Sequence, residues 1–131
     1  MWRTVGSVVA GLVAWAVIVT ILNLGLRAAL PGYHAAEATL QFTAAMKAGR
    51  LIEAAITSLA AGMVVGLIEP SKRWAPALVG LIALALFLPV HVQLWNKFPV
   101  WYHLTFLVPL VPLVVLGGAL TRNRRAAAAA V

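Results

Sequence analysis

The charged residues of this chain divide it into long uncharged runs, and this division limits the fold more than any other feature. Runs of 23, 23 and 24 uncharged residues follow Arg3, Arg73 and Lys97. As an α-helix rising about 1.5 Å per residue, each run is long enough to cross about 30 Å of hydrocarbon. The sequence therefore predicts three transmembrane helices.

A fourth span is predicted between Glu53 and Glu69, although only 15 uncharged residues separate them. That length reaches about 22 Å, so the helix must extend outward through Glu53 toward Arg50. We predict an all-α integral membrane protein, an antiparallel bundle of four transmembrane helices over residues 4–26, 50–68, 74–95 and 100–120. Residues 1–125 form one membrane domain, and the alanine-rich tail 126–131 is expected to fray.

Composition supports membrane embedding and excludes several classes of protein. The chain is 63% hydrophobic and 10% charged, far from the mixture of a water-soluble domain. It has no cysteine, which excludes disulfides and thiolate metal sites. The net charge of +7 suits contact with anionic lipid headgroups. Nucleic-acid binding is not expected, because the sequence has no basic stripe with interleaved aromatic residues.

The aromatic and basic residues predict the boundaries and the orientation of the bundle. Trp2 and Trp74 fall at one membrane–water boundary, and Trp95 and Trp101 fall at the other, as amphipathic rings prefer. Six basic residues lie at the end with the termini and four at the opposite end (Arg3, Lys72, Arg73, Arg122, Arg124 and Arg125 against Arg27, Lys47, Arg50 and Lys97). This excess predicts that both termini are cytoplasmic.

The one long loop, residues 28–49, is expected to carry a short helix on the outer surface. It opens with the turn-forming pair Pro31 and Gly32 and continues through 34–47, which is rich in helix formers. We expect Phe42 and Met46 to rest on the membrane interface, with Glu37, Gln41 and Lys47 facing water. Alternatively, this segment extends the second span continuously toward its N-terminus.

Small residues predict how the helices pack. The second span carries Ala54, Ser58, Gly62 and Gly66 at four-residue spacing, which forms one small-residue face. Such faces let helix backbones approach closely in lipid. We expect this face to meet the looser small-residue face of the first span, which begins at Gly6. Either face could instead bind a second copy or another membrane protein.

A polar layer at the outer end is the one candidate functional site. Ionisable groups at membrane depth are costly and usually face the bundle interior, so the layer is a functional hypothesis. It contains three histidines and one or more polar groups from each span (His34, His91, His103, Asn23, Arg27, Glu53 and Gln93).

Other interpretations of this layer stay open. Glu53 could simply pair with Arg27, and the histidines could be interfacial residues that bond to headgroups and water. A divalent-metal site could use His91, His103 and either Glu53 or His34. A proton or ion relay, or a pocket for a lipid or quinone headgroup, could use Glu53 with the histidines.

The chain shows no pattern of an enzyme. It has no serine–histidine–acid combination typical of a hydrolase and no glycine-rich phosphate loop, and we expect no cofactor. We therefore expect a non-enzymatic accessory or assembly-forming membrane protein with a polar pocket, whose partners are membrane lipids and either a second copy or another membrane protein. The alternative is binding or transport of an ion, proton, metal, lipid or quinone through Glu53, His91 and His103.

Three short segments resemble a known group of proteins. Residues 5–11 (VGSVVAG), 98–102 (FPVWY) and 116–118 (LGG) look like those of a broad group of small uncharacterised bacterial four-helix membrane proteins. The resemblance implies a bacterial inner-membrane location and transfers no functional residues. The chain differs from the small multidrug transporters, whose pattern places an essential glutamate within the first helix, because residues 4–26 contain no acid.

Overall fold

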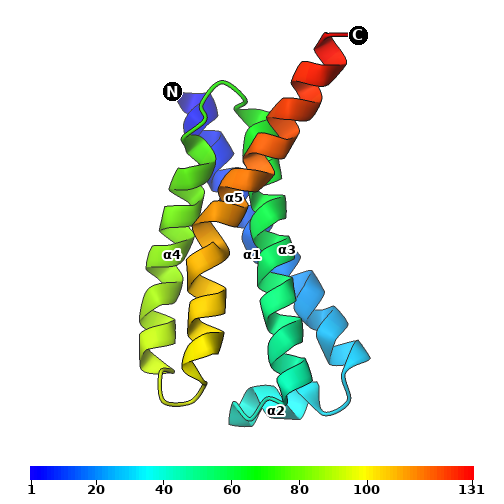
Figure 1. The fold of residues 1–131 in the computed structure, drawn as a ribbon, viewed down its shortest axis with the longest axis vertical. Coiled ribbons are helices and arrows are strands. Elements are labelled where there is room, and N and C mark those ends of the chain that lie inside the picture. Colours follow the sequence, from blue (N-terminus) through cyan, green and yellow to red (C-terminus); the bar gives the residue numbers. More distant parts are fainter.

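The computed structural model describes all 131 residues, and its secondary structure consists of helices alone, without strands. Four of its five helices are long and apolar enough to cross a membrane, which confirms the predicted fold class. The long helices are α1 (Trp2–Ala29), α3 (Ala44–Ile68), α4 (Ala75–Gln93) and α5 (Val100–Ala129), and α2 (Tyr33–Thr39) is a single short element (Figure 1).

The helices run back and forth along the long axis of the molecule. Both termini and the α3–α4 loop lie at one end, called here the terminal end, while α2 and the α4–α5 loop lie at the other, called here the α2 end (Figure 1). On α1, large side chains such as Val13, Val17 and Ile21 are at least half exposed. An outward apolar surface of this kind suits contact with lipid or with another apolar protein surface rather than with water.

The long loop differs from its predicted form in a way that changes which residues are buried. The helix α2 ends at Thr39, where Leu40 adopts a left-handed conformation with φ of 58°. The next helix begins at Ala44, six residues before the predicted start, because the Thr43 side chain caps it by accepting from the Met46 backbone N–H at 3.2 Å. The loop is thus part short helix and part extension of the second span.

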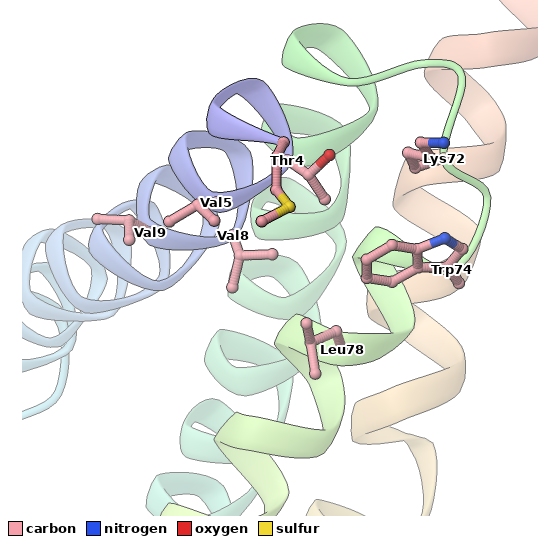
Figure 2. Close-up of a pocket in the computed structure, with 8 residues that line it drawn as sticks. Thr4, Val5, Val8, Val9, Lys72, Trp74 and Leu78 are labelled. Carbon is pink, nitrogen blue, oxygen red and sulfur yellow. The ribbon is translucent and has the colours of Figure 1, made fainter.

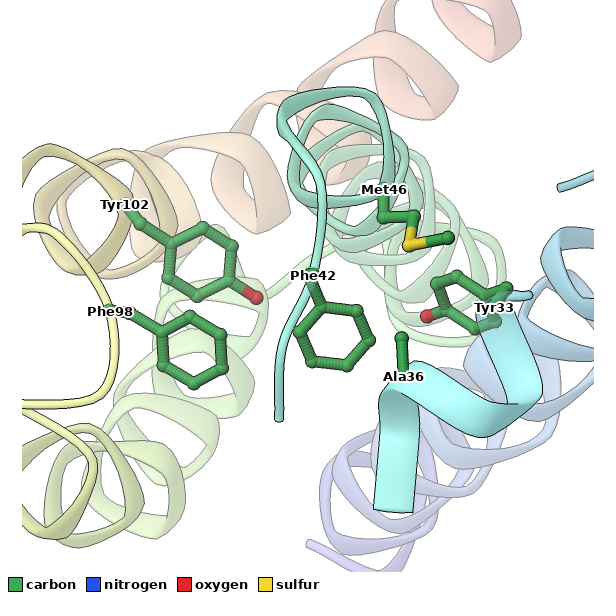
Figure 3. Packing of buried hydrophobic residues seen from close by; sticks show 6 residues of the cluster. All are labelled: Tyr33, Ala36, Phe42, Met46, Phe98 and Tyr102. Atoms are coloured by element: carbon green, nitrogen blue, oxygen red, sulfur yellow. The ribbon is translucent and has the colours of Figure 1, made fainter. Parts of the chain in front are cut away.

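Phe42 and Met46 do not rest on the membrane interface, and that prediction was wrong. Both are buried within the protein, in a cluster that closes the α2 end (Figure 3). Phe42 packs between Tyr33, with ring centroids 5.7 Å apart, and Phe98, at 5.8 Å. Burial inside the bundle removes these rings from water as effectively as lipid would and also fixes α2 to the α4–α5 turn.

The helix α5 continues beyond the predicted span through Ala129, so the alanine-rich tail is helical up to that residue. Alanine has the highest helix propensity, and the arginines before it keep this helical extension soluble beyond the span.

The small-residue face of α3 packs mainly against α5, and the predicted contact with the first span was wrong for its glycines. A Cβ atom built on Gly62 would overlap the Val114 carbonyl, and one on Gly66 would overlap the Thr121 hydroxyl. On α1, nothing lies within 4 Å of a Cβ at Gly6. Ser58 joins this face to α1 by accepting a hydrogen bond from the Trp15 indole at 3.4 Å. Beside the face, Val65 of α3 packs closely against Gly11 of α1.

Candidate functional site

At the α2 end, Glu37 joins α2 to α1. Its carboxylate accepts hydrogen bonds from the Asn23 amide and the Arg27 Nε, each at 2.8 Å, and His34 Nδ1 lies 3.3 Å away. Burial alone would raise the pKa of Glu37, but these three hydrogen bonds and the charge of Arg27 lower it below its ordinary value. Arg27 is therefore paired with Glu37, and the alternative that it pairs with Glu53 was wrong.

Arg50 of α3 is held by two tyrosine hydroxyls and an aromatic ring. Its Nη1 donates to the Tyr33 hydroxyl at 2.8 Å, and its Nε donates to the Tyr102 hydroxyl at 3.1 Å. The guanidinium carbon lies 4.8 Å from the centre of the Phe42 ring, within cation–π range. The Tyr33 hydroxyl donates in turn to Asn23 Oδ1 at 2.9 Å, so one network links helices α1, α2, α3 and α5.

Glu53 follows Arg50 by one turn of α3 and lacks such partners. The residue is only 6% exposed, yet its Oε1 atom has no hydrogen-bond partner. A buried carboxylate without partners is costly and, at membrane depth, typical of a functional position. The unpartnered oxygen makes Glu53 a candidate contact for a ligand.

Two cavities meet at Glu53. One, of about 340 Å³, is mostly polar and lies between α1 and α3, with Asn23, Arg27 and Glu37 in its wall. The other, of about 270 Å³, is mostly apolar and is lined by aromatic rings and by Arg50 (Trp15, Phe87, Tyr102 and Phe106). Glu53 therefore lies where a polar cavity adjoins an aromatic one.

The histidines of α4 and α5 form a buried pair. Nδ1 of His91 and Nδ1 of His103 are 2.8 Å apart, so one ring donates and the other accepts. The His103 ring stacks on Trp95 with centroids 4.7 Å apart, and its Nε2 is buried without a partner. A third cavity of about 110 Å³ is lined by both histidines and by Arg50.

The structure brings together most, but not all, of the predicted polar layer. Asn23, Arg27 and Glu53 share one cavity wall, whereas Gln93 is exposed and belongs to no part of the site. The side chain of His34 is 78% exposed and meets only Glu37.

The predicted metal ligands do not come together. Histidine, aspartate and glutamate side chains nowhere gather in threes, and His91 and His103 bond to each other directly. The metal-site alternative is therefore unsupported.

Sequence reasoning missed four members of the network. Tyr33 and Tyr102 were assigned no part in the site, Glu37 was expected to face water and Arg50 was counted only as a flanking charge. The one available signal was the spacing of Arg50 and Glu53, which puts opposite charges on one face of the helix a turn apart.

Comparisons with protein-family models, curated proteins and solved structures find no match for this chain. The fold and the site define a multi-pass helical membrane protein with a polar cluster buried at one end. Its function has to be argued from the chemistry of that cluster.

Proposed function

We propose that this chain is a non-enzymatic binding protein of the bacterial inner membrane, with both termini in the cytoplasm. Its ligand is a neutral, ring-bearing amphipathic molecule that carries both a hydrogen-bond donor and an acceptor, as quinols and quinones do. The observation that carries the proposal is the buried, unpartnered carboxylate of Glu53 at the junction of two cavities.

The balance of charge around the site favours a neutral ligand. Arg27 is paired with Glu37, and Arg50 faces the same two cavities as Glu53. A charged ligand would leave an unpaired charge in a region of low dielectric, which is costly. A neutral ligand adds hydrogen bonds without adding charge.

The available donors and acceptors match such a ligand. A guanidinium has five N–H groups, and Arg50 uses two of its donor nitrogens on the tyrosines, which leaves N–H groups for a carbonyl oxygen. Glu53 offers an acceptor for a hydroxyl. Because the two residues are one turn apart, they can address donor and acceptor groups of one small molecule.

The apolar cavity is lined by aromatic side chains, against which a ring-bearing ligand can pack. The rings of Trp15 and Phe87 lie 4.7 Å apart, and those of Phe87 and Phe106 lie 5.3 Å apart. Offset and tilted aromatic contacts at such distances are favourable. With volumes of about 340 and 270 Å³, the two cavities lie near the range of small-molecule sites.

Titration of the purified protein with a short-chain ubiquinone analogue tests the proposal through tryptophan fluorescence. We expect saturable quenching that is reduced in Trp15→Phe, since this indole lines the cavity. Glu53→Leu removes this hydrogen-bond acceptor, and the affinity for the reduced, hydroxyl-bearing form should fall about tenfold or more. Absence of saturable quenching, or equal quinol affinity in Glu53→Leu, would show the proposal to be wrong.

The same variant separates a binding role from a structural one. Because Glu53→Leu replaces an unpartnered buried carboxylate with an apolar side chain, it should raise the stability by about 1–3 kcal/mol while it weakens binding. Thermal unfolding in detergent measures this change. Glu69→Gln is the matched control at the terminal end, where the carboxylate already accepts from Ser71 and Thr4, and it should leave quinol affinity unchanged.

A further inference from the structure

A second site lies at the terminal end, far from Glu53. It is a groove of about 490 Å³ between the start of α1 and the start of α4 (Figure 2). Its lining is mostly apolar, with a lysine and a tryptophan from the segment that leads into α4 (Met1, Thr4, Val5, Val8, Val9, Lys72, Trp74 and Leu78). The volume is that of a ligand site rather than of a packing defect.

The lining changes from polar to apolar with depth. Lys72 and Trp74 precede α4, at the level where tryptophan marks the membrane–water boundary. Leu78 lies one turn further along α4, about 6 Å deeper, and Val5 and Val9 cover a similar depth on α1. A cation above an apolar wall is the order in which a phospholipid presents its phosphate and then its acyl chain.

Lys72 is the basic side chain of the groove that is free for a ligand. The molecule has two ion pairs, and both involve Glu37. No carboxylate therefore lies within ion-pair distance of the Lys72 ammonium. The nearby Arg3 is engaged with the Ile68 carbonyl at 2.8 Å. Glu69, the one acid at this end, accepts from the hydroxyls of Ser71 and Thr4.

We propose that this groove binds an anionic phospholipid, with the phosphate at Lys72 and an acyl chain along Val5, Val9 and Leu78. The charge at this end argues against a second copy of the chain as the occupant. The terminal end carries six basic residues and one acid, so two copies brought together there would repel each other. An anionic headgroup instead gains from the same field.

Native mass spectrometry of the protein released from detergent tests this proposal with two lipids of identical acyl chains. We expect phosphatidylglycerol to be retained in preference to phosphatidylcholine. Lys72→Gln should lower phosphatidylglycerol retention about fivefold, the effect of one basic side chain at a lipid surface. Val5→Trp should abolish retention of that lipid by filling the groove.

Matched controls sit elsewhere on the same elements. Lys97→Gln removes a charge at the α2 end, and Val17→Trp adds a ring on α1 away from the groove; both should retain the lipid as the unmodified protein does. Val5 and Val17 are both about half exposed, so neither change enters the core. The loop variant Lys72→Gln tests the proposal independently of any packing change.

Three results would overturn the proposal. Equal retention of the two lipids would show that the charge of Lys72 selects nothing. Unchanged phosphatidylglycerol retention in Lys72→Gln and Val5→Trp would place the lipid elsewhere. A change of oligomeric state in Val5→Trp with lipid retention intact would identify the groove as a protein contact.

Discussion

The hydrogen bond between His91 and His103 determines the proton content of both rings. With the two Nδ1 atoms 2.8 Å apart, one must carry hydrogen and the other must not. Two doubly protonated rings would direct N–H groups at each other. The pair can therefore hold at most one positive charge while this bond persists.

Nuclear magnetic resonance of protein labelled with ¹⁵N in histidine would detect this shared proton. We expect one hydrogen-bonded Nδ1–H resonance, which disappears in His91→Phe and equally in His103→Phe, because either change removes one partner. His34→Phe is the control and should leave the resonance in place, since that ring meets only Glu37. Survival of the resonance in either α4 or α5 variant would contradict the pairing.

The residues also show where sequence reasoning reaches its limit. That an acid and two histidines enter the apolar spans is plain from the sequence, and so is their cost in lipid. Which cation meets which acid is not, because Glu37 reaches Arg27 only after the chain reverses at Gly32, where φ is 78°. This pairing depends on the direction of the turn at Gly32, which the spacing of residues along the sequence does not predict.

At the scale of elements, α2 is attached to α1 by the Glu37 carboxylate, which binds Asn23 and Arg27, and by the hydrogen bond from the Tyr33 hydroxyl to Asn23. Because the pKa of Glu37 is lower in the attached state than its ordinary value, ionisation favours attachment. This contribution is fully present above the ordinary carboxyl pKa and is lost as the pH falls through the lowered one.

Hydrogen exchange of the α2 amides from about pH 7 to about pH 3, corrected for intrinsic rates, measures this loss. We expect protection to decline at the acid end of that range, and Glu37→Gln to give low protection throughout. His34 faces the same carboxylate and gains charge as the pH falls, so the series is repeated in His34→Ala. A decline that persists in Glu37→Gln would assign the pH dependence to another group.

The interface between α3 and α5 depends on glycine. A Cβ at Gly62 would overlap the Val114 carbonyl, so Gly62→Ala should force the helices apart and cost about 1–3 kcal/mol. Thermal unfolding in detergent measures the change. Gly6→Ala is the matched control, because nothing surrounds that position, and its higher helix propensity should leave stability equal or slightly increased. Equal stability of the two variants would mean that α3 and α5 are not in close contact.

This interface explains why four helices were predictable and their partners were not. The spacing of Gly62 and Gly66 identifies a close-packing face, but small residues also occur on the first span and at Gly117 and Gly118 of the last. A small-residue pattern shows that a helix can approach another without ranking the candidates. In the structure the backbone at Gly117 and Gly118 packs closely against α3, so α5 is the partner of this face. This fit depends on the surfaces of both helices and cannot be predicted from the pattern of one.

At the scale of the whole molecule, the alternating direction of the four long helices places the termini on one side of the membrane and α2 on the other. Both proposed sites depend on this arrangement, because the quinol site would open at the α2 end and the phospholipid groove at the terminal end. The excess of basic residues at the terminal end predicts that this end is cytoplasmic.

Single-cysteine labelling tests the orientation directly, because the chain has no cysteine of its own to remove. Asn123→Cys reports on the terminal end, and Gln41→Cys and Asn96→Cys report on the α2 end; all three positions are exposed. In intact bacterial cells whose outer membrane has been permeabilised, an impermeant maleimide should label positions 41 and 96 but not 123. Lysis should then expose position 123, which controls for its reactivity. Labelling of 41 and 96 on opposite sides would contradict the four-span topology, whereas labelling of 123 alone would invert the orientation and place the phospholipid groove in the outer leaflet.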